Sequence, residues 1–199
     1  MVDKQLAGYI LDNHKPAVFV VNKWDLAKGK ALTGEYGDYL RRVFPSLEHV
    51  PIAFITARSG KNVQAVLNLA QALHKQASAR VSTGDLNRVV RQALVSNPPP
   101  MRQNRRAKVF YATQADTNPP TIVLFTNSPE LFDNTYQRYL LRTFRDQLPF
   151  HEVAIRLELR RRAKGEGPAV DEGEEEAPAP QRPPRKKKSG REPELWQDV

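Results

Sequence analysis

The sequence predicts an α/β segment, then a small α+β domain, then a disordered tail. Two short apolar runs, 16–21 and 51–55, are separated by a helical pattern, as is typical of parallel strands buried on both faces. Residues 153–160 alternate apolar and polar side chains, which is the period of a half-buried strand. From residue 163 the chain is rich in proline and charge, and we expect residues 163–199 not to fold.

Residues 1–80 are predicted to form the trailing part of a doubly wound sheet, with only two strands. Helices are expected near 4–13 and 36–44, beside the two strands. A last helix carries apolar residues at helical spacing, which indicates one apolar face. These residues are Val63, Val66, Leu67, Ala70 and Leu73.

Residues 81–162 are predicted to form a separate α+β domain. A helix over 86–96, capped by Ser82 or Thr83, ends at three consecutive prolines, which remove backbone donors. Strands are then expected over 108–114 and 121–126, with a turn at 115–120 between them. A long helix over 129–148 and the strand 153–160 complete the order α-β-β-α-β.

Composition excludes several classes of protein. The chain has no cysteine, so neither a disulfide framework nor a thiol metal site is expected. Neither a signal peptide nor an apolar stretch near twenty residues is present, which predicts a cytoplasmic protein without a membrane partner. The formal charge is +5 for residues 1–84, +6 for 85–162 and −2 for 163–199. A basic body favours polyanionic partners, although solubility alone also explains it.

The most informative motif is Asn22-Lys23-Trp24-Asp25, directly after the first predicted strand. Guanine presents two donors on one edge, and a carboxylate such as that of Asp25 accepts both in charge-assisted hydrogen bonds. Asn22 can bond the base and tie neighbouring loops together, and the stem of Lys23 can lie across the purine face. Ligands of open α/β sheets bind at this carboxyl end of the strands. The alternative is an ordinary charged loop.

A second loop strengthens the interpretation. Thr56-Ala57-Arg58 follows the second predicted strand, where a backbone N–H near Ala57 would donate to guanine O6. However, no Gly-x-x-x-x-Gly-Lys-Ser/Thr occurs in the sequence, so no cradle for nucleotide phosphates is expected.

With these motifs the chain resembles the C-terminal part of the bacterial GTPase family Der (EngA). The resemblance covers roughly residues 1–162. Besides both guanine loops, it rests on Pro99-Pro100, Arg105–Val109, Tyr111–Gln114, Asn118–Phe125, Tyr136–Leu140 and Ile155-Arg156-Leu157. Two departures stand out: Thr56-Ala57-Arg58 replaces a Ser-Ala-Lys-like loop, and the first G domain and the front of the second are absent from this sequence.

The resemblance implies a cytoplasmic GTPase that assists assembly of the large ribosomal subunit. It implies GTP or GDP as ligand, with Mg²⁺ held by residues outside this sequence. The large subunit with its rRNA, and the missing N-terminal G domains of the same protein, are the implied partners. The second domain is implied to be KH-like and to dock on G domains. This chain would then be a fragment with guanine-specificity loops and without the catalytic motifs.

Ordinary KH domains clamp RNA with a Gly-x-x-Gly loop, but residues 85–162 contain no glycine. The remaining candidates for RNA contact are Arg102, Arg105, Arg106 and Lys108, before the first strand of the domain; a solvated loop is the alternative. A stand-alone RNA- or ribosome-binding module without hydrolysis therefore remains a second hypothesis. No catalytic residues and no metal ligands are expected, since the four histidines are scattered.

Overall fold

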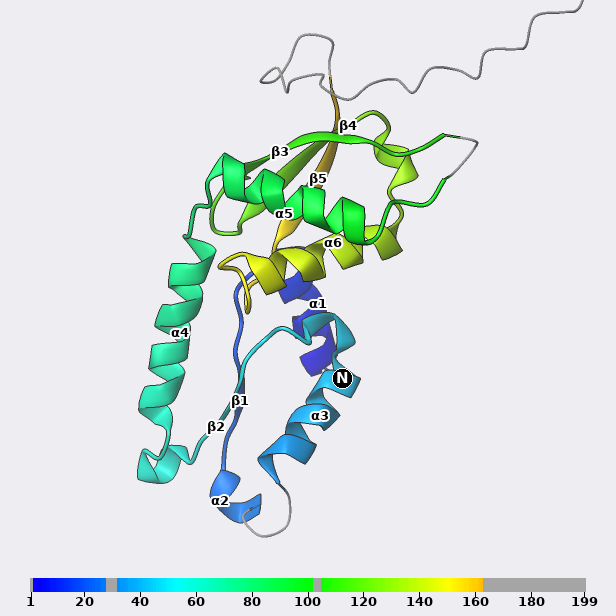
Figure 1. Cartoon of the computed structure of the whole chain (residues 1–199). Coiled ribbons are helices and arrows are strands. Elements are labelled where there is room, and N and C mark those ends of the chain that lie inside the picture. The colour runs from blue at the N-terminus through cyan, green and yellow to red at the C-terminus, as the bar shows by residue number, and fades with distance from the viewer. Residues whose placement is uncertain (1, 28–31, 102–104, 163–199) are drawn as a thin grey trace, which may run out of the picture. The chain divides into compact units, whose positions relative to one another are not determined.

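The structure is a computed structural model that describes residues 2–27, 32–101 and 105–162. The predicted tail, 163–199, lies outside the described residues. No helix in the described part is long and apolar enough to cross a membrane. The order of elements is shown in Figure 1. They are α1 (Val2–Asp12), β1 (Phe19–Val21), α2 (Trp24–Ala27), α3 (Thr33–Val43), η1 (Pro45–Leu47), β2 (Ile52–Phe54), η2 (Ala57–Ser59), α4 (Val63–Ala77), α5 (Thr83–Ser96), β3 (Val109–Asp116), β4 (Thr121–Thr126), η3 (Pro129–Leu131), α6 (Asn134–Gln147) and β5 (Arg156–Arg161).

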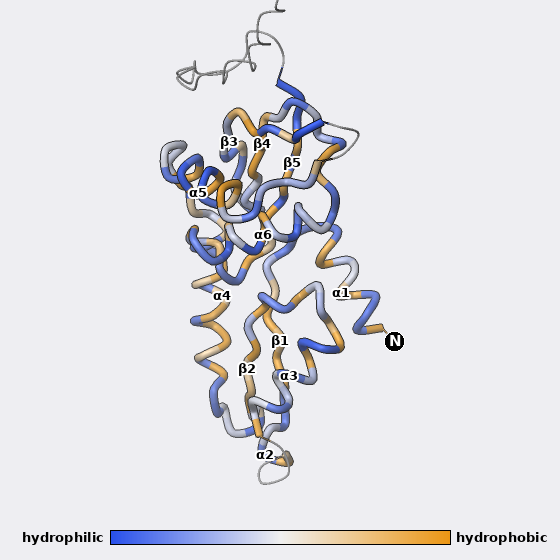
Figure 2. Tube along the Cα trace, turned by 45° about the vertical axis from the view of Figure 1, so that its right-hand side comes forward, coloured by the Kyte–Doolittle hydropathy of each residue, from blue (hydrophilic) through white to orange (hydrophobic). Residues whose placement is uncertain are grey.

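The first sheet has two parallel strands, β1 and β2, with Phe19 opposite Ile52. Helices α1 and α3 lie on one side of these strands and α4 on the other (Figures 1 and 2). This confirms the predicted α/β segment with two strands. Each strand is three residues long and shorter than predicted, and each has a single hydrogen-bonded neighbour among the described residues.

The core of this first part is small. Ala7, Leu47 and Val50 form its buried centre, and the rings of Phe19 and Phe44 pack 5.2 Å apart. The apolar face predicted for α4 is mostly exposed, since Leu67 keeps 53% of its surface in solvent. Helix α4 therefore forms as predicted, and of the five apolar residues only Leu73, near its end, is buried in the described structure.

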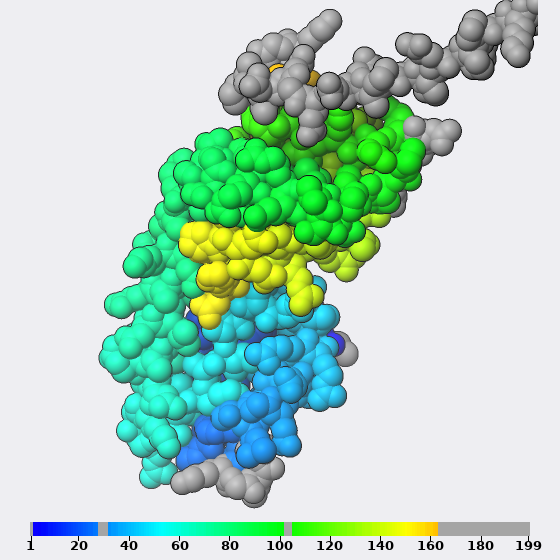
Figure 3. Space-filling view, viewed as in Figure 1, coloured from blue at the N-terminus to red at the C-terminus, as the bar shows by residue number. Residues whose placement is uncertain are grey.

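The second sheet has the order β3-β4-β5, with β3 antiparallel and β5 parallel to β4. Helices α5 and α6 contact each other (Figure 3) and pack with this sheet around one hydrophobic core. The strand predicted over 153–160 begins only at Arg156. Its expected apolar side nevertheless faces the core, since Val153 and Ile155, just before β5, are buried and Leu157 and Leu159 pack against that core. The predicted α-β-β-α-β order is also confirmed.

The predicted helix over 129–148 is wrong at its start. Residues 129–131 form a 3-10 turn, and α6 begins only after Asp133. The Asp133 carboxylate accepts a hydrogen bond from Tyr136 N–H at 2.7 Å, which satisfies one of the free donors of the first helical turn. A strong N-cap therefore sets the boundary.

Helix α4 ends inside the core of the second part. Leu73 and Ala77, in its last turns, are 3% and 1% exposed and belong to that core. Between them, Gln76 donates to the Glu152 carboxylate at 2.9 Å and accepts from Glu152 N–H at 3.0 Å. After α4, Ser82 caps α5 as predicted, because its hydroxyl accepts from Asp85 N–H at 3.0 Å.

Candidate functional site

The two predicted guanine loops lie at the same edge of the first sheet. Because β1 and β2 are parallel, the segments that follow Val21 and Phe54 leave the sheet together. Backbone hydrogen bonds join them: Ile55 N–H donates to Val21 O at 2.9 Å, and Trp24 N–H donates to Ile55 O at 3.0 Å. The loops thus form one unit.

Asn22 connects the two loops through its side chain. Its Oδ1 accepts from Lys23 N–H at 2.7 Å and from Ala57 N–H at 3.1 Å. The expected tie between the loops is present in this geometry. It also engages the backbone N–H that the sequence assigns to guanine O6, so a bound base would share this donor with Asn22 or displace it.

The backbone of the first loop is held in an unusual conformation. Lys23 has φ +59°, a left-handed value that costs free energy for a residue with a side chain. The neighbouring Trp24 holds the turn in place, because its ring packs 4.4 Å from Phe54 and 5.7 Å from Tyr36. The aromatic residue inside the motif is thus a structural anchor, a role that the sequence did not reveal.

Asp25 lies in the first turn of α2 and is exposed. Its carboxylate makes no hydrogen bond within the described part of the chain, so both oxygens are available as acceptors.

In the second loop Thr56 is buried and its N–H donates to Lys61 O at 3.1 Å, while Arg58 is exposed. Gly60 closes the turn at φ +72°, which glycine adopts without strain.

The predicted RNA-contact residues form a second cluster. Arg106 and Lys108 are exposed, and Asn127 holds their backbone, donating to Arg106 O and accepting from Lys108 N–H, both at 2.9 Å. Arg105 is also exposed and donates to the Ser128 hydroxyl at 3.1 Å. Arg102 lies outside the described residues.

Sequence reasoning missed the arginines that end β5. Arg161 Nε donates to Asn127 O at 3.2 Å, which places it beside the loop that carries Lys108. Arg162 lies over the Phe110 ring at 5.1 Å. The run Arg160-Arg161-Arg162 was visible in the sequence, but only the parallel β4–β5 pairing brings it to the same loop.

The carboxylate of Glu130, near this cluster, is stabilised in its charged form by several groups. The pKa of Glu130 lies below its usual value, first because its own backbone N–H donates to it, with the charges of Arg161 and Arg105 adding to the effect.

Comparison with known proteins agrees with this geometry. The family model described as the KH-domain-like region of EngA bacterial GTPase enzymes, C-terminal, matches residues 80–160. The GTPase Der of Rhodopirellula baltica is 50% identical over 173 residues, 87% of this chain and 38% of that protein. The chain matches the C-terminal region of the Der (EngA) GTPase family.

Other Der proteins give the same picture. GTPase Der of Geobacter metallireducens is 40% identical over 165 residues, 82% of this chain and 38% of the relative. That of Moorella thermoacetica is 41% identical over 160 residues, 80% of this chain and 36% of the relative. The chain thus spans little more than a third of the Der proteins that it matches and corresponds to the C-terminal region of the family.

Proposed function

We propose that this chain supplies guanine recognition and a KH-like domain to a Der-type GTPase that acts in assembly of the large ribosomal subunit in the cytoplasm. The observation that supports guanine recognition is the hydrogen bond from Ala57 N–H to Asn22 Oδ1 at 3.1 Å, which joins the two loops named by the motifs. GTP or GDP is the proposed ligand.

Base selection follows from the chemistry of Asp25. An exposed carboxylate in the first helical turn of α2 offers two parallel acceptors to guanine N1–H and the N2 amino group. Adenine has no hydrogen at N1, so it would leave the carboxylate unpaired at a cost of about 1–3 kcal/mol. Asn22, Lys23, Thr56, Ala57 and Arg58 shape the rest of the proposed base site.

Phosphate binding and hydrolysis are assigned to other residues. The described part of the chain has no group of three or more His, Asp or Glu side chains that could hold a metal ion. Phosphoryl transfer depends mostly on phosphate and metal contacts. We therefore propose that preceding G-domain segments, which this sequence does not contain, supply these groups, and that this chain by itself does not hydrolyse GTP.

We propose that residues 1–80 recognise the base, that residues 81–162 form the KH-like domain, and that residues 163–199 form a charged tail. The cluster of Arg105, Arg106, Lys108 and Arg161 supports contact of the second region with rRNA phosphates. It equally supports the second candidate function, a ribosome- or RNA-binding module without nucleotide hydrolysis.

The base assignment is tested by Asp25→Asn in a chimera that joins the preceding part of the Rhodopirellula baltica relative to this chain. Xanthine carries a carbonyl where guanine has its amino group, so an amide side chain can donate to it. We expect GDP affinity to fall by about 10–100-fold, from the loss of charge-assisted hydrogen bonds, and XDP affinity to rise. Asp38→Asn, on the exposed face of α3, is the matched control. Unchanged preference between GDP and XDP would refute the base assignment.

RNA contact is tested by Arg106→Gln combined with Lys108→Gln. Each lost phosphate contact should reduce the slope of log affinity against log salt by about 0.7–0.9. Arg91→Gln, exposed on α5, removes one charge elsewhere and is compared with Arg106→Gln alone and with Lys108→Gln alone. A salt slope that falls equally in the control would argue against this surface.

A further inference from the structure

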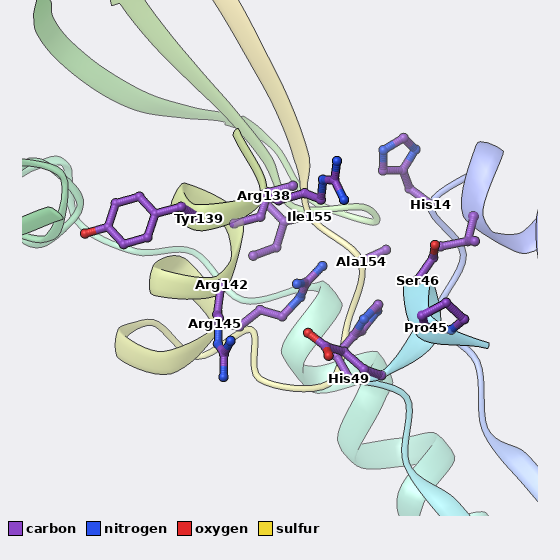
Figure 4. Close-up of a pocket in the computed structure, with 13 residues that line it drawn as sticks. His14, Pro45, Ser46, His49, Arg138, Tyr139, Arg142, Arg145, Ala154 and Ile155 are labelled. Carbon is purple, nitrogen blue, oxygen red and sulfur yellow. The ribbon is translucent and has the colours of Figure 1, made fainter. Parts of the chain in front are cut away.

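A second pocket lies away from the guanine loops. It has a volume of about 540 Å³ and is lined by the end of α1, the segment 45–49, one face of α6 and the residues before β5 (Figure 4). His14 precedes β1 and His49 precedes β2, so the pocket adjoins the amino-terminal ends of these strands. The guanine loops leave the carboxyl ends of the same strands, and the two sites are therefore distinct.

The lining is strongly positive. Arg138, Arg142 and Arg145 follow one another at helical spacing on α6 and all line the pocket, whereas Glu48 is the single acidic residue in its lining. Like charges at such spacings repel and destabilise a helix. An anion in the pocket would offset this repulsion.

One buried polar group at the pocket lacks a partner. Arg145 Nε is buried and has no hydrogen-bond partner within the described residues. Buried donors are nearly always paired, and an unpaired one points to a missing water or ion. The guanidinium of Arg142 is exposed and makes no hydrogen bond or ion pair within the described residues. An acceptor bound in the pocket could pair with both guanidinium groups.

The protonation states suit an acceptor-rich ligand. Burial lowers the pKa of His49 to about 4, with Arg145 adding to the effect, and burial followed by the charge of Arg156 lowers the pKa of His14. Both imidazoles are therefore neutral at pH 7, where each can donate one N–H. Burial also lowers the pKa of Arg145, yet a guanidinium remains protonated in proteins.

We propose that this pocket binds a small phosphate ligand with a terminal phosphate group, such as a phosphate monoester or pyrophosphate. Three guanidinium groups exceed what one carboxylate needs, and their planar forks match phosphate oxygens. A terminal phosphate has three free oxygens and close to two charges, whereas an internal phosphodiester of duplex RNA has two free oxygens and one charge. The lining from four segments favours the small ligand.

The test is equilibrium dialysis of the 199-residue chain with radiolabelled pyrophosphate at low chloride. Arg142→Gln should weaken binding about tenfold or more, because one charge-assisted pair is lost. Arg91→Gln, on α5, removes the same charge away from the pocket and should leave binding unchanged. Arg142→Lys should retain an intermediate affinity, since it keeps the charge and loses the fork. Arg142 is exposed, so these variants should fold, as circular dichroism would verify.

The outcomes separate a pocket from general charge attraction. Pyrophosphate binding that falls in Arg142→Gln and persists in Arg91→Gln supports the proposal. Absence of binding, or an equal loss in both variants, overturns it. A parallel titration with duplex RNA distinguishes the sources of phosphate: if Arg142→Gln weakens RNA binding while pyrophosphate does not bind at all, the groups serve a nucleic-acid surface and the small-ligand proposal is wrong.

Discussion

Acid should destabilise the first part of the chain through His49. The ring lies between the end of η1 and β2, beside Arg145, and its pKa in the folded state is about 4, against about 6.5 in an unfolded chain. Between these values the unfolded state binds more protons than the folded state. The contribution of His49 to the free energy of unfolding is therefore fully present above about pH 6.5 and is lost as the pH falls towards 4.

The size of this effect follows from the shift. The full difference corresponds to at most about 3 kcal/mol. We expect about 1–2 kcal/mol between pH 7.5 and pH 5, because the ring keeps partial contact with solvent. The pKa of His14 is lowered in the same direction, so its contribution adds to that of His49 and does not cancel it.

The assay is urea unfolding followed by tryptophan fluorescence in a Trp196→Phe background, which leaves Trp24 as the single tryptophan. The buffer should contain no phosphate, so that the proposed pocket stays free. Between pH 7.5 and pH 5, the free energy of unfolding should fall by about 1–2 kcal/mol less in His49→Gln than in the parent. His74→Gln, exposed on α4, is the control. Equal pH dependence in the parent and in His49→Gln would refute the reasoning, because carboxylates act alike in both.

Three further outcomes are expected. Leu124→Ala should lower the free energy of unfolding by about 2–5 kcal/mol, since Leu124 is fully buried in the second sheet. Val95→Ala, at an exposed position of α5, should change this free energy little. If urea titrations gave similar losses for the two variants, the assigned core would be contradicted. Ser82→Ala should cost about 1 kcal/mol through loss of the α5 N-cap, and full stability by calorimetry would argue against the cap. Amide hydrogen exchange should be slower in 85–162 than in 1–80, because the large core lies in the former; equal protection of both regions would contradict this.

Local patterns predicted the elements well. The alternation from Val153 to Arg160 identified the inward residues of β5 and of the segment just before it. The tie from Asn22 to the second loop followed from the order of strand and motif. Element boundaries depended on finer chemistry. The Asp133 cap sets the start of α6, and no periodicity in the helix itself reveals that a proline-initiated turn precedes it.

The phosphate pocket could not be predicted from sequence. Its residues come from positions 14, 49 and 145, which carry no shared motif, and only tertiary packing brings them together. The spacing of the apolar residues of α4 indicates one apolar face, of which Leu73 is buried while Leu67 is exposed in the described structure. Helical periodicity identifies a face that can be buried and does not say what covers it.

Helix α4 begins three residues after Gly60 of the second guanine loop and ends with Ala77 in the core of the KH-like region. The number of residues in α4 therefore fixes the angle about the helix axis between the side chains at its two ends. One inserted residue would turn them by about 100° relative to each other, while a whole extra turn would restore their facing and separate them by about 5.4 Å. The exposed side chains of α4 can therefore vary more readily than the number of its residues, which sets how its two ends face.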